Sequence, residues 1–283
     1  MVQGLHEEGK KLLLERDDIE PITIMSANEN EIMEAAKEVH GITVRTANIS
    51  RKIIENSKNL LIVSRHGVGY DSIDVDALND SNIPLAIAAH SNMISVAEHA
   101  MFMLLALSKN VFYYDRFARK ADWTTRWDIR AWDVAEKNLL VVGFGRIGSR
   151  LVKRALAFDM NVYVYDPYVN AEEIKKSGAV LVDNFLDVLS QMDAVSLHCP
   201  KNNETTNMFS DNEFKIMKES SFLRDWAGQA VQPQDIGWST YLGGGTKRPK
   251  GSKLPNNYLT GCRGGEHPSM SVVFGQRKVM HFV

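Results

Sequence analysis

The sequence predicts an α/β fold in which parallel sheets are covered by helices. Short apolar strands alternate with amphipathic helices along most of the chain, and this order is typical of parallel sheets. The segment 59–64 contains the run LLIVS, which has the continuous apolar character of a strand buried on both faces. The chain has 283 residues, which is enough for two domains of ordinary size.

In the first part of the chain, four apolar segments are short enough to be strands. We expect these strands at 22–25, 42–46, 59–64 and 84–88, with helices at 1–20, 30–40, 50–56 and 75–79. A long helix should follow at 95–112, because its apolar residues recur at three- and four-residue spacing. The polar and aromatic segment 117–132 carries three tryptophans. It is either a surface loop with some packed indoles or a dimer contact, since aromatic residues anchor interfaces.

The second part of the chain repeats the alternation up to Leu223. Strands are expected at 138–142, 161–165, 180–181, 194–198 and from Ser221, with helices at 146–158, 171–176, 184–190 and 211–217. The residues after Leu223 are rich in Gly, Pro, Gln and Asn, and only 271–274 has the pattern of a strand. We therefore expect one domain over 1–94, a second over 95–223, and a poorly structured tail over 224–283.

Composition excludes several classes of protein. The formal net charge is −2, so no basic field favours nucleic acid. The two cysteines, Cys199 and Cys262, lie far apart and form neither a disulfide framework nor a zinc pattern. The N-terminus lacks the apolar core of a secretion signal, and no segment is long enough to cross a membrane. We expect a cytoplasmic protein that binds no metal.

The strongest motif is a glycine turn between the strand at 138–142 and the helix after it. Gly143, Gly145 and Gly148 form the spacing GxGxxG inside a strand–helix–strand unit, which ends at Asp166. The first glycine permits the tight turn, the second lets backbone approach a pyrophosphate, and the third brings helix and strand close. The helix N-terminus directs unpaired N–H groups at the phosphates. This combination predicts a Rossmann domain that binds a dinucleotide.

Asp166 indicates which dinucleotide is bound. Its carboxylate should accept hydrogen bonds from the adenosine ribose hydroxyls, and its charge would repel a 2′-phosphate, so we expect NAD. Cys199 and Pro200 follow the strand at 194–198, and ligands of such sheets bind beyond the carboxyl ends of the strands. We therefore expect both residues to touch the cofactor. His198 is better explained as a hydrogen-bonded histidine at a strand end than as a catalytic group.

Four motifs in this order resemble one enzyme family. They are SRHGVGYDSID, SVAEHAMFMLLAL, LLVVGFGRIGSRLVKRALAFDMNVYVYDPY and AVSLHCP. Over residues 5–223 the chain looks like a D-isomer-specific 2-hydroxyacid dehydrogenase, a family that includes phosphoglycerate dehydrogenase and hydroxypyruvate/glyoxylate reductases. The resemblance implies a flavodoxin-like substrate domain, an NAD domain, an active site between them, and a homodimer. It also implies hydride transfer between NAD and a 2-hydroxyacid or 2-oxoacid.

The resemblance also implies roles for single residues. The backbone of Gly67, Val68 and Gly69 would bind the substrate carboxylate, with Val68 also near the nicotinamide. Arg45 would reach the charged group of the substrate, although a plain surface arginine is the alternative. The remaining residues would contact the cofactor: Val96 at the start of the long helix, Arg146 and Ile147 through their amides, and Cys199 beside the nicotinamide.

The family's catalytic side chains are not found in this sequence. The family pattern places a substrate-orienting arginine at the position of Gly228, and no TPH motif follows to supply the histidine that its glutamate would partner. Arg224 and the pair Glu266–His267 are weak substitutes. The family's opening strand is reduced to the residues before the HEEG segment, so both domains should be incomplete. We interpret this as a truncated or frame-shifted gene product or as a diverged paralogue, and the coding DNA would distinguish these explanations.

Two functions therefore stay open. The first is an NAD-dependent oxidoreductase acting on a D-2-hydroxyacid. The second is a family member that binds NAD but is catalytically impaired, and that acts as a binding or regulatory protein or has no function. The general acid or base that would separate them is the group the sequence does not supply, and its loss typically costs about 10²- to 10⁴-fold in rate.

Overall fold

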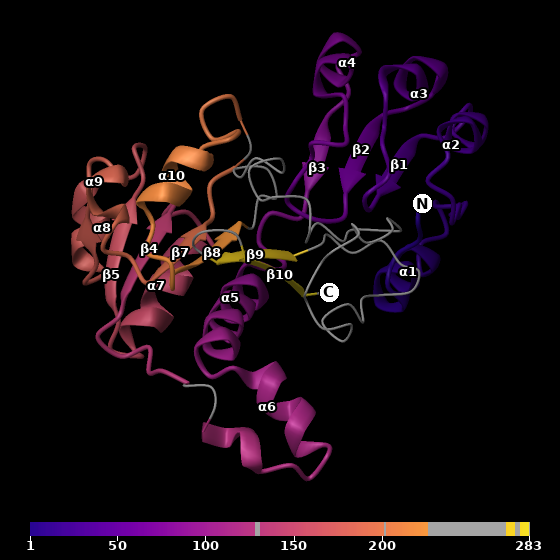
Figure 1. Ribbon diagram of the computed structural model, residues 1–283. Coiled ribbons are helices and arrows are strands. Elements are labelled where there is room, and N and C mark those ends of the chain that lie inside the picture. The colour runs from indigo at the N-terminus through magenta and orange to yellow at the C-terminus, as the bar shows by residue number, and fades with distance from the viewer. Residues whose placement is uncertain (128–130, 201, 226–269, 275–277, 283) are drawn as a thin grey trace. The chain divides into compact units, whose positions relative to one another are not determined.

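The computed structural model describes residues 1–127, 131–200, 202–225, 270–274 and 278–282 (Figure 1). The chain separates into two compact units, Met1–Asn92 and Met93–Val283. The division lies two residues before the boundary that the sequence suggested.

Unit 1 contains a parallel sheet with strand order β1-β2-β3. The strands are β1 (Gly41–Val44), β2 (Ile62–Arg65) and β3 (Leu85–Ile87), and four short helices connect and flank them: α1 (Glu7–Leu14), α2 (Glu29–Ala35), α3 (Arg51–Asn56) and α4 (Val75–Asp80). Asn28 begins α2 because its side chain accepts hydrogen bonds from the N–H groups of Asn30 and Glu31. Aliphatic side chains from both helices and strands fill the core, among them Ile32, Ile53 and Val63.

The first residues of unit 1 extend this sheet, which corrects the helix expected over 1–20. Val2 forms parallel bridges to both Ile24 and Val44 and is only 3 % exposed. Its N–H donates to the carbonyl of Thr43 at 2.7 Å. Val2 thus pairs with both Val44 of β1 and Ile24, through isolated bridges rather than a strand. The strand expected over 22–25 is reduced to the single bridge at Ile24.

Unit 2 contains a seven-stranded sheet with order β10-β9-β8-β7-β4-β5-β6. The strands are β4 (Asn138–Val142), β5 (Asn161–Tyr165), β6 (Val180–Leu181), β7 (Ala194–Leu197), β8 (Phe222–Asp225), β9 (Met270–Phe274) and β10 (Lys278–Phe282). Strands β4 to β8 pair in parallel, as predicted. Strands β9 and β10 pair antiparallel, so the sheet is mixed, and the tail contributes one more strand than the sequence suggested.

Both faces of this sheet are buried at β4 and β7. The burial on both faces that was expected for the strand at 59–64 of unit 1 is wrong, because Leu61 and Ile62 are 66 % and 41 % exposed. Leu139 and Val141 of β4 belong to one core cluster with residues of α5 (Met93–Ser108) and α7 (Gly148–Leu156). Leu140 and Val142 belong to a second cluster on the other face. This second cluster includes residues of α9 (Leu186–Leu189) and α10 (Asp211–Ile216). Helix α8 (Ala171–Lys176) contributes Ile174 to the first cluster, the one with Leu139 and Val141.

The long helix expected over 95–112 is divided into two. Helix α5 ends at Ser108, Asn110 takes a left-handed conformation with φ 50°, and α6 (Val111–Ala118) begins after it. A 3₁₀ turn, Thr124–Trp127, follows. In the sequence, apolar residues continue at three- and four-residue spacing past Ser108. The pattern therefore gave no sign of the break at Asn110.

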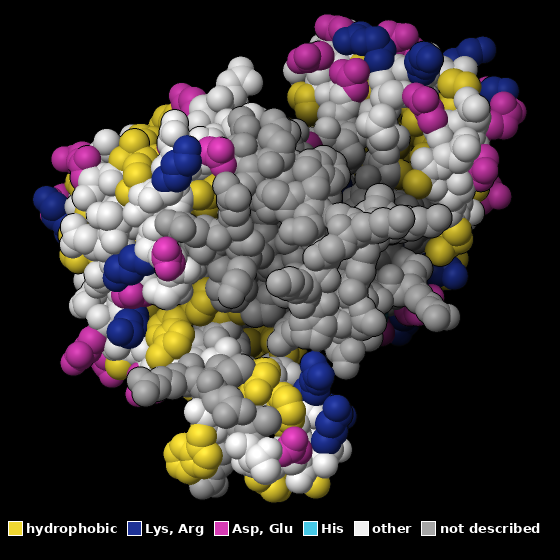
Figure 2. All heavy atoms as spheres, in the orientation of Figure 1, with side chains coloured by type: hydrophobic (Ala, Val, Ile, Leu, Met, Phe, Trp, Pro, Cys, Tyr) yellow, Lys and Arg dark blue, Asp and Glu magenta, His cyan; other side chains and the backbone are white. Residues whose placement is uncertain are grey.

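The segment from α6 to the 3₁₀ turn, which we call the aromatic arm (residues 111–127), is poorly covered by the rest of unit 2. Helix α6 buries no residue, and Trp123 and Trp127 are 68 % and 76 % exposed. Figure 2 shows hydrophobic side chains gathered at the lower end of the view, where Figure 1 places α6. The third tryptophan differs: Trp132 stacks on Phe222 with ring centroids 5.3 Å apart.

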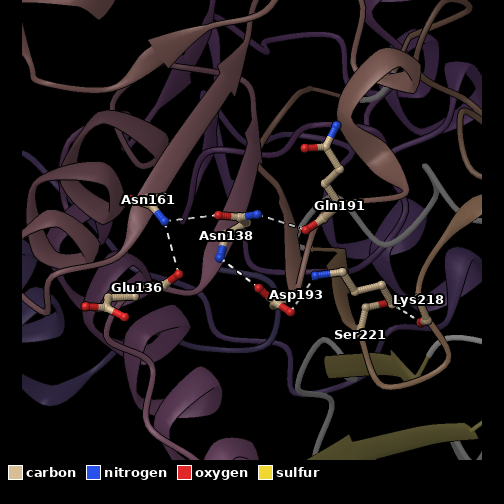
Figure 3. Close-up of polar contacts among 7 residues, drawn as sticks. All are labelled: Glu136, Asn138, Asn161, Gln191, Asp193, Lys218 and Ser221. Carbon is tan, nitrogen blue, oxygen red and sulfur yellow. Dashed lines mark hydrogen bonds and ion pairs between the residues drawn. The ribbon is translucent and has the colours of Figure 1, made fainter.

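A polar network holds the amino ends of the parallel strands of unit 2 (Figure 3). Asp193 accepts a hydrogen bond from the N–H of Asn138 at 2.9 Å and pairs with the Nζ of Lys218 at 2.8 Å. The side-chain Nδ2 of Asn138 donates to the backbone carbonyl of Gln191, and the side-chain Nδ2 of Asn161 donates to the Oδ1 of Asn138. These contacts join the amino ends of β4, β5 and β7, whereas ligands of open α/β sheets bind beyond the carboxyl ends.

No helix among the described residues has the length and apolar character needed to cross a membrane.

Candidate functional site

The candidate cofactor site lies at the carboxyl ends of β4, β5 and β7. Strand order changes direction between β4 and β7, because β5 and β6 continue on one side of β4 and β7 and β8 on the other. In an open α/β sheet this switch point is where ligands bind. The glycine turn after β4, Asp166 after β5, and Cys199 with Pro200 after β7 all belong to this edge. The structure therefore brings the predicted cofactor residues of three strands to one edge.

The three glycines of the turn meet different surroundings. Gly143 has φ +96°, and a Cβ there would come within 2.9 Å of the backbone N of Cys199. A Cβ on Gly148 would overlap the carbonyl oxygen of Gly143. A Cβ on Gly145 would meet no atom within 4 Å. The first and third glycines are thus needed by the fold itself, whereas the second faces open space at the turn.

That open space fits the pyrophosphate of a dinucleotide. It lies at the start of α7, a nine-residue helix that begins at Gly148 rather than at Arg146 as expected. Arg146 and the N-cap residue Ile147 precede the helix. The first N–H groups of a helix have no acceptor within the helix itself. Helix N-termini attract anions through these donors and the helix dipole. The roles of Arg146 and Ile147 in binding pyrophosphate stay predictions.

Asp166 is held in place by the turn and by its own loop. Its Oδ2 accepts a hydrogen bond from the N–H of Phe144 at 2.7 Å. Its Oδ1 accepts from the N–H groups of Tyr168 at 2.9 Å and Val169 at 3.2 Å. The carboxylate is half-buried and fixed in direction before any ligand binds.

Cys199 and His198 follow β7. Burial raises the pKa of the Cys199 thiol to about 11, with a further contribution from the charge of Asp225. The thiol is therefore neutral at physiological pH, and it fits the wall of a nicotinamide site better than a nucleophile. The Nε2 of His198 lies 2.8 Å from the Oγ of the buried Ser196. This contact agrees with the structural interpretation of His198. Pro200 is exposed, and Val96 is half-buried in the first turn of α5.

The predicted substrate residues gather at the carboxyl ends of β1 and β2 in unit 1. Arg45 directly follows β1 and the glycine loop 67–69 follows β2. The N–H of His66 donates to the carbonyl of Val44 at 2.8 Å, so the two loops are linked. The Nε of Arg45 is buried without a hydrogen-bond partner among the described residues, which leaves a donor for a ligand. Arg45 is thus a half-buried arginine rather than a fully exposed one.

Sequence reasoning missed two residues at this edge. Arg65 lies over the glycine loop: its Nη1 donates to the carbonyl of His66, and a Cβ on Gly67 (φ +148°) would overlap its guanidinium. Burial lowers the pKa of Arg65. An arginine before a glycine pair is the signal that could have found it.

The second missed residue is Gln3. It is 4 % exposed with φ +65°, and its Oε1 accepts from the N–H groups of Thr46 at 2.6 Å and Ala47 at 2.8 Å. It holds the loop that begins at Arg45. No motif marks this contact, because it joins residues more than 40 positions apart.

Most positions where the family's catalytic side chains were sought lie outside the described part of the chain. Gly228 and the pair Glu266–His267 are among the residues that the structure does not describe. Cys262 lies there as well. For Arg224 only the backbone is described, in β8.

Residues 101–235 match the NAD binding domain of the D-isomer specific 2-hydroxyacid dehydrogenases. The chain is also 32 % identical, over 220 residues, to a D-3-phosphoglycerate dehydrogenase of Methanocaldococcus jannaschii, covering 77 % of this chain and 41 % of that protein. The chain belongs to the D-isomer-specific 2-hydroxyacid dehydrogenase family. The cofactor of the matched domain is NAD. The match runs past Leu223, where the resemblance had been expected to end.

Further relatives within the family agree with the fold. A glyoxylate reductase of Thermococcus litoralis is 31 % identical over 207 residues, which are 71 % of this chain and 62 % of that protein. The structure of a D-lactate dehydrogenase from Aquifex aeolicus, complexed with NAD and lactic acid, superposes with a TM-score of 0.76 at 26 % identity, covering 83 % of this chain and 71 % of that one. This chain spans less than two thirds of the length of the two curated relatives named here.

Proposed function

We propose that the protein is an NAD-dependent oxidoreductase that acts on the CH–OH group of a D-2-hydroxyacid. The observation that supports this most directly is the glycine turn at the carboxyl end of β4, with Asp166 fixed beside it, in a domain of this family. When bound, the cofactor supplies or accepts the hydride. In the reductive direction C2 of the oxoacid gains that hydride and its oxygen gains a proton.

In this proposal the two units supply different groups. Unit 2 holds the dinucleotide through Gly143–Gly148 and Asp166, with Val96, Cys199 and Pro200 near the nicotinamide. Unit 1 holds the substrate: the N–H groups of Gly67, Val68 and Gly69 bind the carboxylate, Val68 also approaches the nicotinamide, and Arg45 adds a positive charge. Arg65 offers a second cation at the same edge. Two arginines favour a substrate that carries a charged group besides its carboxylate.

The alternative is a family member that binds NAD without turnover. It is favoured by the tail, where the sequence has Gly228 at the family's arginine position and no TPH motif. We also propose that the protein works in the cytoplasm as a homodimer, with the exposed aromatic arm as the contact.

One experiment separates these functions. Purified protein is titrated with NADH, and reduction of glyoxylate, hydroxypyruvate and phosphohydroxypyruvate is then followed by NADH absorbance. Binding with turnover supports the dehydrogenase. Binding without turnover on any of the three oxoacids supports the alternative, and no binding contradicts both.

A further inference from the structure

One side-chain contact joins the two loops that lie on either side of the glycine turn. The hydroxyl of Tyr168, in the loop after β5, donates a hydrogen bond to the carboxylate of Glu204, in the loop after β7. Strands β5 and β7 are the two neighbours of β4 in the sheet. The contact therefore links both sides of the candidate cofactor site, and we call it the Tyr168–Glu204 link.

Both ends of the link are held by their own loops. The N–H of Tyr168 donates to the Oδ1 of Asp166 at 2.9 Å, so Tyr168 contacts both carboxylates, one through its backbone and one through its hydroxyl. The Oδ1 of Asn202 accepts from the N–H groups of Glu204 and Thr205, each at 2.9 Å. The Oγ1 of Thr205 donates to the carbonyl of Pro200 at 2.6 Å. Glu204 is therefore an exposed side chain on a backbone that these hydrogen bonds hold within residues 202–205.

The hydrogen bonds of Asp166 show why a second carboxylate is useful at this place. A carboxylate offers about four acceptor positions. Three of them are used by the N–H groups of Phe144, Tyr168 and Val169. The adenosine ribose of NAD carries two neighbouring hydroxyls, at 2′ and 3′, and both are donors. Asp166 has capacity for about one of them.

We propose that Glu204, held by Tyr168, is a second carboxylate of the ribose site, and that it excludes the 2′-phosphate of NADP. Its free acceptor positions would take the ribose hydroxyl that Asp166 does not. Two carboxylates near the 2′ position repel a phosphate more strongly than one. The pKa of Tyr168 is raised, mainly by its hydrogen bond to Glu204 and then by burial and by nearby negative charge, so the donor stays protonated over the physiological range.

This inference rests on dinucleotide binding and not on turnover. The test measures the dissociation constants of NADH and NADPH by fluorescence titration for the wild type, Glu204→Gln and Tyr168→Phe. We expect Glu204→Gln to lower the preference for NADH over NADPH about tenfold, chiefly by improving NADPH binding. Tyr168→Phe keeps the charge but releases the side chain, so we expect a smaller change in the same direction, with weaker NADH binding.

The matched control is Glu219→Gln, which removes an exposed carboxylate from the turn after α10, at the opposite edge of the sheet. It should leave the ratio of the two constants unchanged. Thermal melting of each ligand-free variant shows that the fold is intact. The wild-type preference should also weaken at high salt if charge causes it, because screening shortens the reach of the repulsion.

Two results would overturn the inference, and they differ in meaning. If the wild type binds NADH and Glu204→Gln keeps the same preference within twofold, the role of Glu204 is wrong and the cofactor site stands. If the wild type binds neither dinucleotide, the inference fails together with the proposed function.

Discussion

Gly145 and Gly148 lie three residues apart in one turn, yet a methyl group would have opposite effects at the two positions. At Gly148 it would overlap the carbonyl oxygen of Gly143, which belongs to the backbone and has little room to move. At Gly145 it would meet only open space. The same residue type therefore serves the fold at one position and the ligand at the other.

We expect Gly145→Ala to fold normally and to bind NADH at least tenfold more weakly, because the methyl group enters the space proposed for the pyrophosphate. Gly148→Ala should instead lower the free energy of unfolding by about 2 kcal/mol or more. Fluorescence titration and urea unfolding measure the two effects, and each variant serves as the control for the other. Equal losses of stability in both variants would contradict this assignment.

Cys199 leads to a prediction about pH. Its thiol has a pKa of about 11 against an ordinary 9.0, so at pH 8 its thiolate fraction is about 100-fold lower than that of a free cysteine. Iodoacetamide should therefore alkylate Cys199 slowly in the folded protein and quickly in 6 M urea. Peptide mapping by mass spectrometry follows Cys199 separately from Cys262, and rapid labelling of Cys199 in the native protein would contradict the raised pKa.

The raised pKa of Cys199 also makes the free energy of unfolding depend on pH, and it lowers that free energy at high pH. The folded-state pKa lies above the unfolded value, so the unfolded chain loses this proton first as pH rises. The contribution of Cys199 to stability is complete below pH 9 and is lost as pH approaches 11. Cys199→Ala should flatten this part of the stability profile.

At the scale of elements, Asp193 joins β7 to two neighbouring elements at the amino ends of the strands. It accepts from the N–H of Asn138 at the start of β4, and it pairs with Lys218 just before β8. The Asp193 side chain is only 21 % exposed, so its partners would lose much of their solvation if it were removed. The network joins β4, β7 and the segment before β8 at their amino ends.

We expect Asp193→Ala to lower the free energy of unfolding by about 2 kcal/mol, because it leaves the Asn138 N–H and the Lys218 ammonium without their acceptor. Lys218→Met should cost less, since Asn138 keeps its bond. The control is Lys175→Met, which removes an exposed helical pair with Glu172 (3.6 Å) and should change stability by less than about 0.5 kcal/mol. Urea unfolding gives all three values, and a neutral Asp193→Ala would show that the network has no net effect.

At the scale of the whole molecule, the aromatic arm (residues 111–127) leads to a prediction about oligomeric state. Its tryptophans Trp123 and Trp127 are mostly exposed, although large aromatic side chains are usually covered in a monomer. A second copy of this chain would bury them.

We expect the wild type to be a dimer by light scattering after size exclusion, and Trp123→Ser with Trp127→Ser to shift it toward the monomer. Leu12→Ser is the control, because it removes an equally exposed apolar side chain (67 %) from α1 in unit 1. A wild type that is monomeric at micromolar concentration would contradict the dimer, and so would a double variant that stays dimeric.

Much of the fold could be predicted because its signals are local. The run LLVV followed by Gly143, Gly145 and Gly148 places a strand, a turn and a helix within eleven residues, and the structure confirms each to within two residues at its ends. The family followed from four motifs over residues 5–223 and the cofactor from the glycine turn with Asp166, and both are confirmed. The break of the long helix at Asn110 was missed, because a left-handed residue changes chain direction without changing hydrophobic spacing.

The features of the candidate site also fall into two groups, those that the sequence predicts and those that only the tertiary structure shows. By itself, the sequence determined the α/β class, the family and the NAD turn, because each depends on motifs whose own residues lie close together in the chain. The roles of Arg45, Gly67–Gly69 and the cofactor residues stay predictions. Only the tertiary structure decided that Gln3 holds the Arg45 loop, that Arg65 lies over Gly67, and that Tyr168 meets Glu204. The last contact spans 36 positions, and only the parallel pairing of β4 with β5 and β7 brings those two loops to one edge.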